Sequence, residues 1–214
     1  MIHSIAERTV TLGLRHNNES IRLHSIRLLE MLIISHSSAP AHRLYFVTPL
    51  KQVRWCSKVE DYFRLELIPN GHPVLKPEEM SKKGAVYLGL ILDELMRRDT
   101  AHSIVTVILQ SLLSITKQRM EYWDRIFGFL SSFPESMPES LSSSQMQSVL
   151  YLLKAMFLFL LRMPQTRIHR VIFEEALEQL QCRKDIVQQT IKLAELFKDI
   201  DPSGVDAPQR SSRK

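Results

Sequence analysis

The segment from Asn17 to His36, NNESIRLHSIRLLEMLIISH, carries apolar residues at helical spacing over most of its length and contains neither glycine nor proline. Apolar residues that recur every three or four positions fall on one side of an α-helix. Asn17 or Asn18 can cap the start, because a short side-chain oxygen accepts a hydrogen bond from a free N–H of the first turn. So wide an apolar face has to be covered, which predicts a helix inside a stack of helix pairs.

The two sides of this predicted helix differ in character. The side that we expect to be buried consists of one line of residues and three flanking apolar ones: Ile21, Ser25, Leu28, Leu32, Ile26, Leu29 and Ile33. The opposite line can face solvent or a partner and consists of Ser20, His24, Arg27 and Met31, with Glu30 beside it. His24 and Arg27 on this line are candidates to bind phosphate, although a solvated face is the more common reason for such residues.

The same spacing of apolar residues recurs along most of the chain. It predicts further helices over 1–15, 77–98, 100–116, 120–133, 145–163, 166–181 and 185–197. Pro77 suits the first position of its helix, and Thr100 can cap the next one. The connections between most of these segments are short, so we expect consecutive helices to pair antiparallel.

The stretch from 38 to 76 interrupts the pattern. It contains four prolines and five aromatic residues, and its aromatic residues are Tyr45, Phe46, Trp55, Tyr62 and Phe63. Aromatic side chains favour packing against the helices over disorder, so we expect a long ordered loop with a short helix over 53–63 and no strand pair. Residues 201–214, DPSGVDAPQRSSRK, are polar and contain proline and glycine, which predicts a disordered tail.

These elements predict an all-α protein. Residues 1–200 are expected to form one HEAT-like α-solenoid of antiparallel helix pairs, with the long loop 38–76 inside it. HEAT-type repeats are about forty residues long and degenerate in sequence, so the lack of exact repetition is no obstacle. A compact helical bundle is the alternative architecture.

The composition narrows the class of protein only mildly. A net charge of +5 weakly favours acidic partners. Cys56 and Cys182 lie far apart and form no motif, which is typical of reduced thiols in an intracellular protein. The most apolar run, Val149 to Met163, is shorter than the ~20 residues that a spanning helix needs and contains Lys154, so we expect a core helix and no membrane contact.

The common motifs of catalytic and metal sites are absent from the sequence. There is no nucleophile elbow, phosphate-binding loop, dinucleotide glycine pattern, HExxH or CxxC pair. His169 precedes Glu174 and Glu175 on one predicted helix, but a metal site needs three or four ligands, and a surface face is the simpler interpretation. We therefore predict a protein without catalytic activity, metal or cofactor.

Direct RNA binding is the alternative function that the residues suggest. Lys51, Arg54 and Trp55 could clamp and stack a nucleic-acid strand. A tryptophan that anchors the loop to the helices explains the same residues without RNA. The terminal RSSRK is too short to identify as a nuclear signal.

Two blocks of the sequence resemble symplekin and its fungal counterparts. Residues 17–34, NNESIRLHSIRLLEMLII, are similar to the family's I-R-x-H-[SA]-I-[KR] pattern. Residues 65–95, LELIPNGHPVLKPEEMSKKGAVYLGLILDEL, are similar to its I-P-x-x-H-P element and the E-x-x-x-K/E-G helix that follows. A weaker similarity covers residues 138–164, so the resemblance extends over most of 17–195.

The resemblance implies a HEAT-type N-terminal domain of a nuclear, non-catalytic scaffold in pre-mRNA 3′-end cleavage and polyadenylation. The implied partner of this domain is the phosphatase that acts on the C-terminal repeats of RNA polymerase II, while other cleavage and polyadenylation factors bind elsewhere on family members. The family's docking face matches the exposed line of the helix over 17–36, which gives His24, Arg27 and Met31, with Arg22 at the edge. The family's preceding repeats and its large C-terminal portion have no counterpart in these 214 residues.

Overall fold

The structure, a computed structural model of the 214-residue chain, describes residues 2–40, 44–56, 65–69 and 71–197. Most of these residues are helical, as predicted. The α-helices are α1 (Ile2–Leu14), α2 (Glu19–Ser35), α3 (Pro77–Leu95), α4 (His102–Thr116), α5 (Trp123–Ser132), α6 (Ser143–Leu161), α7 (Arg170–Gln179) and α8 (Lys184–Glu195). The segment 201–214, for which the sequence predicts disorder, lies outside the described residues.

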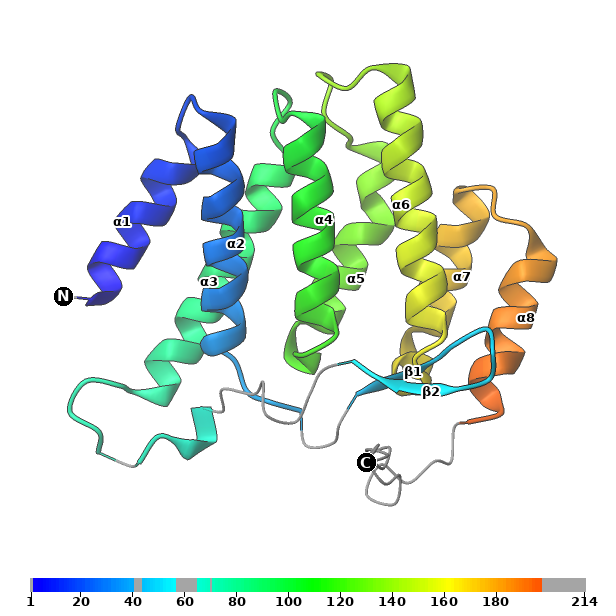
Figure 1. The fold of residues 1–214 in the computed structure, drawn as a ribbon, viewed down its shortest axis with the longest axis horizontal. Helices are drawn as coiled ribbons and strands as arrows, with labels where there is room; N and C mark the ends of the chain where they lie inside the picture. Colours follow the sequence, from blue (N-terminus) through cyan, green and yellow to red (C-terminus); the bar gives the residue numbers. More distant parts are fainter. Residues whose placement is uncertain (1, 41–43, 57–64, 70, 198–214) are drawn as a thin grey trace, which may run out of the picture.

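The helices stand side by side in a row, with α1 and α8 at opposite ends (Figure 1). Even-numbered helices contact one another in turn, α2 with α4, α4 with α6 and α6 with α8. The helices α3, α5 and α7 lie behind them (Figure 1). One continuous hydrophobic core runs between the layers from Val10 to Ile191. This arrangement is an α-helical repeat, and it confirms the predicted fold class over the compact bundle.

The helix α2 lies within the segment 17–36, as its apolar spacing predicted. Asn18 caps it, because its Oδ1 accepts a hydrogen bond of 2.9 Å from the backbone N–H of Ser20. Its fully buried apolar side chains are Ile26, Leu29 and Ile33. The buried face of α2 is thus rotated slightly around the helix from the predicted one. Leu28 is only half-buried, and Ile21 is 40% exposed.

Arg119, which follows α4, holds the C-terminal end of α2. Its side chain is fully buried, and Nε and Nη2 donate to the carbonyl oxygen of Ile34 at 3.0 and 2.7 Å. Nε also donates to Ser37 Oγ at 2.9 Å. The last carbonyl groups of a helix carry partial negative charge and have no intrahelical partner, so a planar cationic fork both satisfies and neutralises them.

The helix α3 crosses the same end of α2 at close range. A Cβ added at Gly84 would lie 2.5 Å from Tyr122 Oη and 2.7 Å from the carbonyl oxygen of His36. No side chain fits at that distance, so glycine permits the approach of the two backbones. This contact gives a physical reason for the glycine in the E-x-x-x-K-G block.

The segment 38–76 contains a β-hairpin, so the expectation of no strand pair was wrong. Strand β1 (Tyr45–Val47) pairs antiparallel with β2 (Val53–Trp55), and Tyr45 is opposite Trp55. The predicted helix over 53–63 is therefore wrong at 53–55, and most of its remainder, 57–63, lies outside the described residues. A 3₁₀ turn, η2 (Leu65–Leu67), follows.

The hairpin lies across the ends of α6 and α8, far from the helices that flank it in sequence (Figure 1). The N–H of Val47 donates to the carbonyl oxygen of Arg162 at 2.9 Å, just beyond the end of α6. Tyr45 Oη donates to the carbonyl oxygen of Phe197 at 2.9 Å, just beyond α8. The described part of the long loop is thus ordered, and it connects the second helix to the last ones.

The His-Pro end of the element I-P-x-x-H-P forms a local turn before α3. His72 Nδ1 accepts from the backbone N–H groups of Val74 and Leu75, at 3.2 and 2.8 Å. Ile68 is buried in a small cluster with Leu65 and Met80. This imidazole therefore shapes the backbone at the entry to α3.

The helix α6 is the one helix in the described residues that is long and apolar enough to cross a membrane. It is 19 residues long, so the length argument against such a span was wrong. Its buried side, which includes Val149, Leu153 and Phe157, packs in the core shared with α4, α7 and α8. Ser142 and Gln145 form a reciprocal capping box at its start. These contacts explain its apolar composition by packing within the protein.

Candidate docking surface

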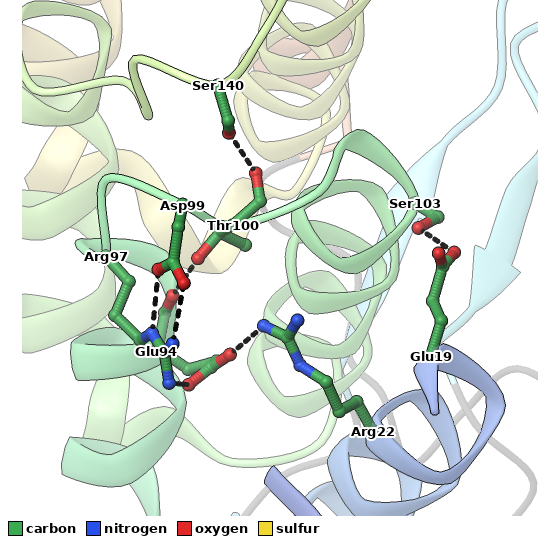
Figure 2. A network of polar contacts seen from close by, with 8 residues as sticks. All are labelled: Glu19, Arg22, Glu94, Arg97, Asp99, Thr100, Ser103 and Ser140. Atoms are coloured by element: carbon green, nitrogen blue, oxygen red, sulfur yellow. Dashed lines mark hydrogen bonds and ion pairs between the residues drawn. The ribbon is translucent and has the colours of Figure 1, made fainter. Parts of the chain in front are cut away.

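The register of α2 against α3 is set by a buried ion pair. Arg22 Nη2 lies 2.5 Å from Glu94 Oε1, and the two side chains are 16% and 5% exposed. Figure 2 shows Arg22 reaching from α2 toward this carboxylate near the end of α3. Glu94 Oε2 lies 3.5 Å from Arg97 Nη1, so both carboxylate oxygens have a cationic neighbour. A buried charge requires such partners, and they fix the position of Arg22.

Further contacts extend this network to the connection between α3 and α4 and to the turn before α6 (Figure 2). Arg97 binds Asp99 through two hydrogen bonds of 3.1 and 2.9 Å, and this pairing raises the pKa of Arg97 and lowers that of Asp99. Thr100 Oγ1 donates to the carbonyl oxygen of Glu94 at 2.9 Å, and Ser140 Oγ donates to that of Thr100 at 2.8 Å. Thr100 therefore binds the C-terminal end of α3. The prediction that it caps α4 was wrong, because the residue before α4 is Ala101.

The predicted docking residues separate into two groups. His24 and Met31 are exposed, Met31 at 68%, and the side chain of Arg27 is 46% exposed. Positions 24, 27 and 31 lie within about 60° of one another around a helix, so they form one outward line. Arg22 lies about 140° from Arg27 by the same geometry, and its side chain turns inward to Glu94. We refer to His24, Arg27 and Met31 as the α2 line.

The α2 line continues onto α4 through Gln110 and Ser111, for which the sequence predicted no role. Arg27 Nη2 donates to Gln110 Oε1 at 3.1 Å, and Nη1 donates to Glu30 Oε2 at 2.8 Å. Ser111 Oγ donates to the same Glu30 oxygen at 2.7 Å. Gln110 is a long polar side chain in the middle of an apolar helix, and this was the sequence feature that could have indicated its part in the surface. The guanidinium is held in place while part of it stays open to solvent.

The candidate metal ligand His169 lies in an aromatic cluster. Its ring centre is 5.0 Å from that of Phe127 and 6.0 Å from that of Trp123. Glu174 and Glu175 instead border a groove between α7 and α8. Among the residues whose positions are described, no group of three or more His, Cys, Asp or Glu side chains is placed to hold a metal ion.

The residues suggested for RNA binding lie on the hairpin. Arg54 is exposed, while Trp55 is half-buried with its ring edge-on to Tyr45 at 5.7 Å. This packing matches the anchoring role considered for the tryptophan. Stacking with a base would require the exposed ring face that such packing reduces.

A row of helix pairs, locked by internal polar contacts and presenting an outward line of charged and flexible side chains, defines a helical-repeat scaffold. The sequence matches the Symplekin/PTA1 N-terminal family over residues 3–195, and the chain belongs to that family. The family acts as a scaffold in mRNA 3′-end processing, which implies contacts with other processing factors and a nuclear role.

Proposed function

We propose that this chain is a non-catalytic, nuclear docking module of the pre-mRNA 3′-end cleavage and polyadenylation machinery. Its α2 line binds the phosphatase that acts on the C-terminal domain of RNA polymerase II, and other cleavage and polyadenylation factors assemble around it. The observation that carries the proposal is the outward placement of His24, Arg27 and Met31 on a helix that is fixed from both sides.

The chemistry of the α2 line suits a protein partner. Arginine and methionine are enriched at protein interfaces, and arginine is frequent among the residues that contribute most to binding. Arg27 is already oriented by Gln110 and Glu30, so less side-chain entropy is lost when a partner binds. Met31 adds an exposed apolar contact one turn further along the helix.

A pull-down with the purified phosphatase tests the proposal. Arg27→Glu reverses the charge and should weaken binding by about tenfold or more, as expected for a central arginine. Met31→Ala leaves the contacts of Arg27 intact and should weaken binding less. Arg167→Glu makes the same charge change at an exposed position outside α2, and it serves as the matched control.

Two results would contradict this assignment. Equal binding by the Arg27→Glu variant and the parent protein would exclude the α2 line. If binding were lost on nuclease treatment, and RNA bound directly with a steep dependence on salt, the alternative of a basic RNA-binding repeat protein would replace it. The exposed Arg54 on the hairpin would then be the first residue to examine.

A further inference from the structure

A groove of about 540 Å³ lies between α6 and α8 and is lined on one side by the turn of the hairpin. Its walls are mainly apolar and contain no acidic residue. They are formed by Pro49, Lys51, Ala155, Leu158, Arg162, Ile186, Gln189, Thr190 and Leu193. The groove is thus built from a different part of the solenoid than the α2 line.

Arg162 stands at the C-terminal end of α6 in this groove. Its side chain is half-buried, and it forms no ion pair within the described parts of the chain. Its Nε is inaccessible to solvent and has no hydrogen-bond partner. Burial lowers the pKa of this guanidinium, since removal from water disfavours the charged form. A half-buried cation without an acidic partner is stabilised by an anion that reaches its exposed part, so the site favours an incoming anion.

Two further cations lie near Arg162 without an acidic partner in the described residues. Lys117 Nζ is 4.6 Å from the centre of the Phe159 ring, and Arg162 Cζ is 5.7 Å from the same centre. Lys51 lines the groove from the hairpin turn, where its backbone φ is 58°. Three basic residues of α7 and of the start of α8 differ from them, because Arg170, Arg183 and Lys184 each have an acidic partner within 2.9 Å.

We propose that the groove binds an acidic, partly apolar peptide segment of a partner protein, with a carboxylate of the peptide on Arg162. Apolar residues of the peptide would cover Leu158, Ile186 and Leu193, and Lys51 would hold a second acidic group at the rim. An extended run of exposed cations and stacking rings is typical of nucleic-acid sites. This groove has one inner cation between aliphatic walls, which favours a peptide.

Selection from random peptides of about 12 residues, roughly 18 Å long as helices, tests the inference with the full chain. Parent protein is the bait, and the Arg162→Gln variant is used to remove peptides that do not need the arginine. We expect the enriched peptides to carry Asp or Glu beside Leu, Ile or Phe. Their dissociation constants, measured by fluorescence anisotropy, should rise by about tenfold or more for Arg162→Gln.

Two other variants keep the result interpretable. Ala155→Trp fills the groove but changes neither the charge nor Arg162, so it should prevent peptide binding. It tests the groove independently if Arg162→Gln alters the fold. Arg167→Gln, an equal charge change at an exposed site outside the groove, should stay within about twofold of the parent. Circular dichroism confirms that each variant is folded.

Failure of this inference is distinguishable from failure of the α2 docking proposal, because Arg27→Glu leaves the groove intact. The inference is overturned if no enriched peptide depends on Arg162, or if Arg162→Gln and Arg167→Gln weaken binding equally. It is also overturned, in favour of nucleic acid, if an oligouridylate displaces the peptide and depends on Arg162 in the same way.

Discussion

The Glu94 carboxylate lies 2.5 Å from the Arg22 guanidinium and joins two helices whose paired residues are 72 positions apart in sequence. The contact turns one of the two arginines of the I-R-L-H-S-I-R block inward. The other, Arg27, is left at the surface with part of its charge exposed. Two residues of the same type in one short block therefore have different roles, one in positioning the helix and one in the α2 line.

Removing the charge of Glu94 should destabilise the fold strongly. The Glu94→Gln variant leaves Arg22 buried without its anion, and we expect a loss of about 3 kcal/mol in the free energy of unfolding. This is the low end of the range for a buried pair, because Arg22 retains 16% exposure. Urea denaturation followed by circular dichroism measures the loss. Glu178→Gln breaks an exposed pair with Lys184, and that control should melt like the parent.

A double substitution checks the cause of that loss. Replacing both partners, Arg22→Met with Glu94→Leu, removes both buried charges and should recover much of the stability. A double variant as unstable as the sum of the two single ones would show that the ion pair is not the cause.

The core assignment of α2 makes a second stability prediction. Leu29 is fully buried and Leu28 is half-buried. We expect Leu29→Ala to lower the free energy of unfolding by about 2–5 kcal/mol, and Leu28→Ala by less than about 2 kcal/mol. Denaturant melts of the two variants measure the difference, and the reverse order would contradict the buried face seen in the structure.

Helical periodicity was enough to predict α2 and its general orientation, but not the rotation of its face. Ile21 and Leu28 count as apolar in any pattern, whereas their exposure depends on where α1, α3 and α4 make contact. Outward placement of His24 and Met31 follows from spacing alone. The partners of Arg22 and Arg27, which are Glu94 and Gln110, lie 72 and 83 positions away, and no local pattern reveals them.

The β-hairpin was not predicted, also because distant contacts determine it. Its strands are only three residues long, which is too short for an alternation of apolar and polar residues to stand out. The contacts that hold the hairpin, Val47 to Arg162 and Tyr45 to Phe197, join segments more than 100 positions apart. A strand stabilised by such contacts has little signature in its own sequence.

Arg119 provides a third prediction, which separates charge from geometry. Arg119→Lys keeps a cation at the end of α2 but loses the planar fork that serves Ile34 and Ser37. We expect a loss of about 1–3 kcal/mol in the free energy of unfolding, because at least one buried acceptor remains unpaired. Arg125→Lys, at an exposed arginine that donates to the Ala85 carbonyl oxygen, is the matched control. Equal losses in the two variants would contradict the special role of Arg119.

Cys56 should make the stability of the fold depend on pH in the alkaline range. Burial raises the pKa of this thiol from 9.0 to about 12, and the nearby Lys117 offsets only part of that effect. Above pH 9.0 the unfolded chain releases the proton while the folded chain keeps it, so the unfolded state binds fewer protons. Stability from this group is therefore complete below pH 9.0 and falls as the pH rises toward about 12.

Burial also raises the pKa of Tyr122. Comparison of the parent with Cys56→Ala separates the pH dependence due to Cys56 from that due to Tyr122. Urea melts below pH 9.0 and at about pH 10.5 should show a larger loss of stability in the parent than in the variant. A second readout uses Cys182→Ser, which leaves one free thiol, Cys56. That thiol should react slowly with a disulfide reagent in the folded protein and rapidly in urea, because the thiolate is the reactive form. Equal slopes with pH, or rapid reaction of the folded protein, would show that Cys56 ionises as readily as an exposed cysteine.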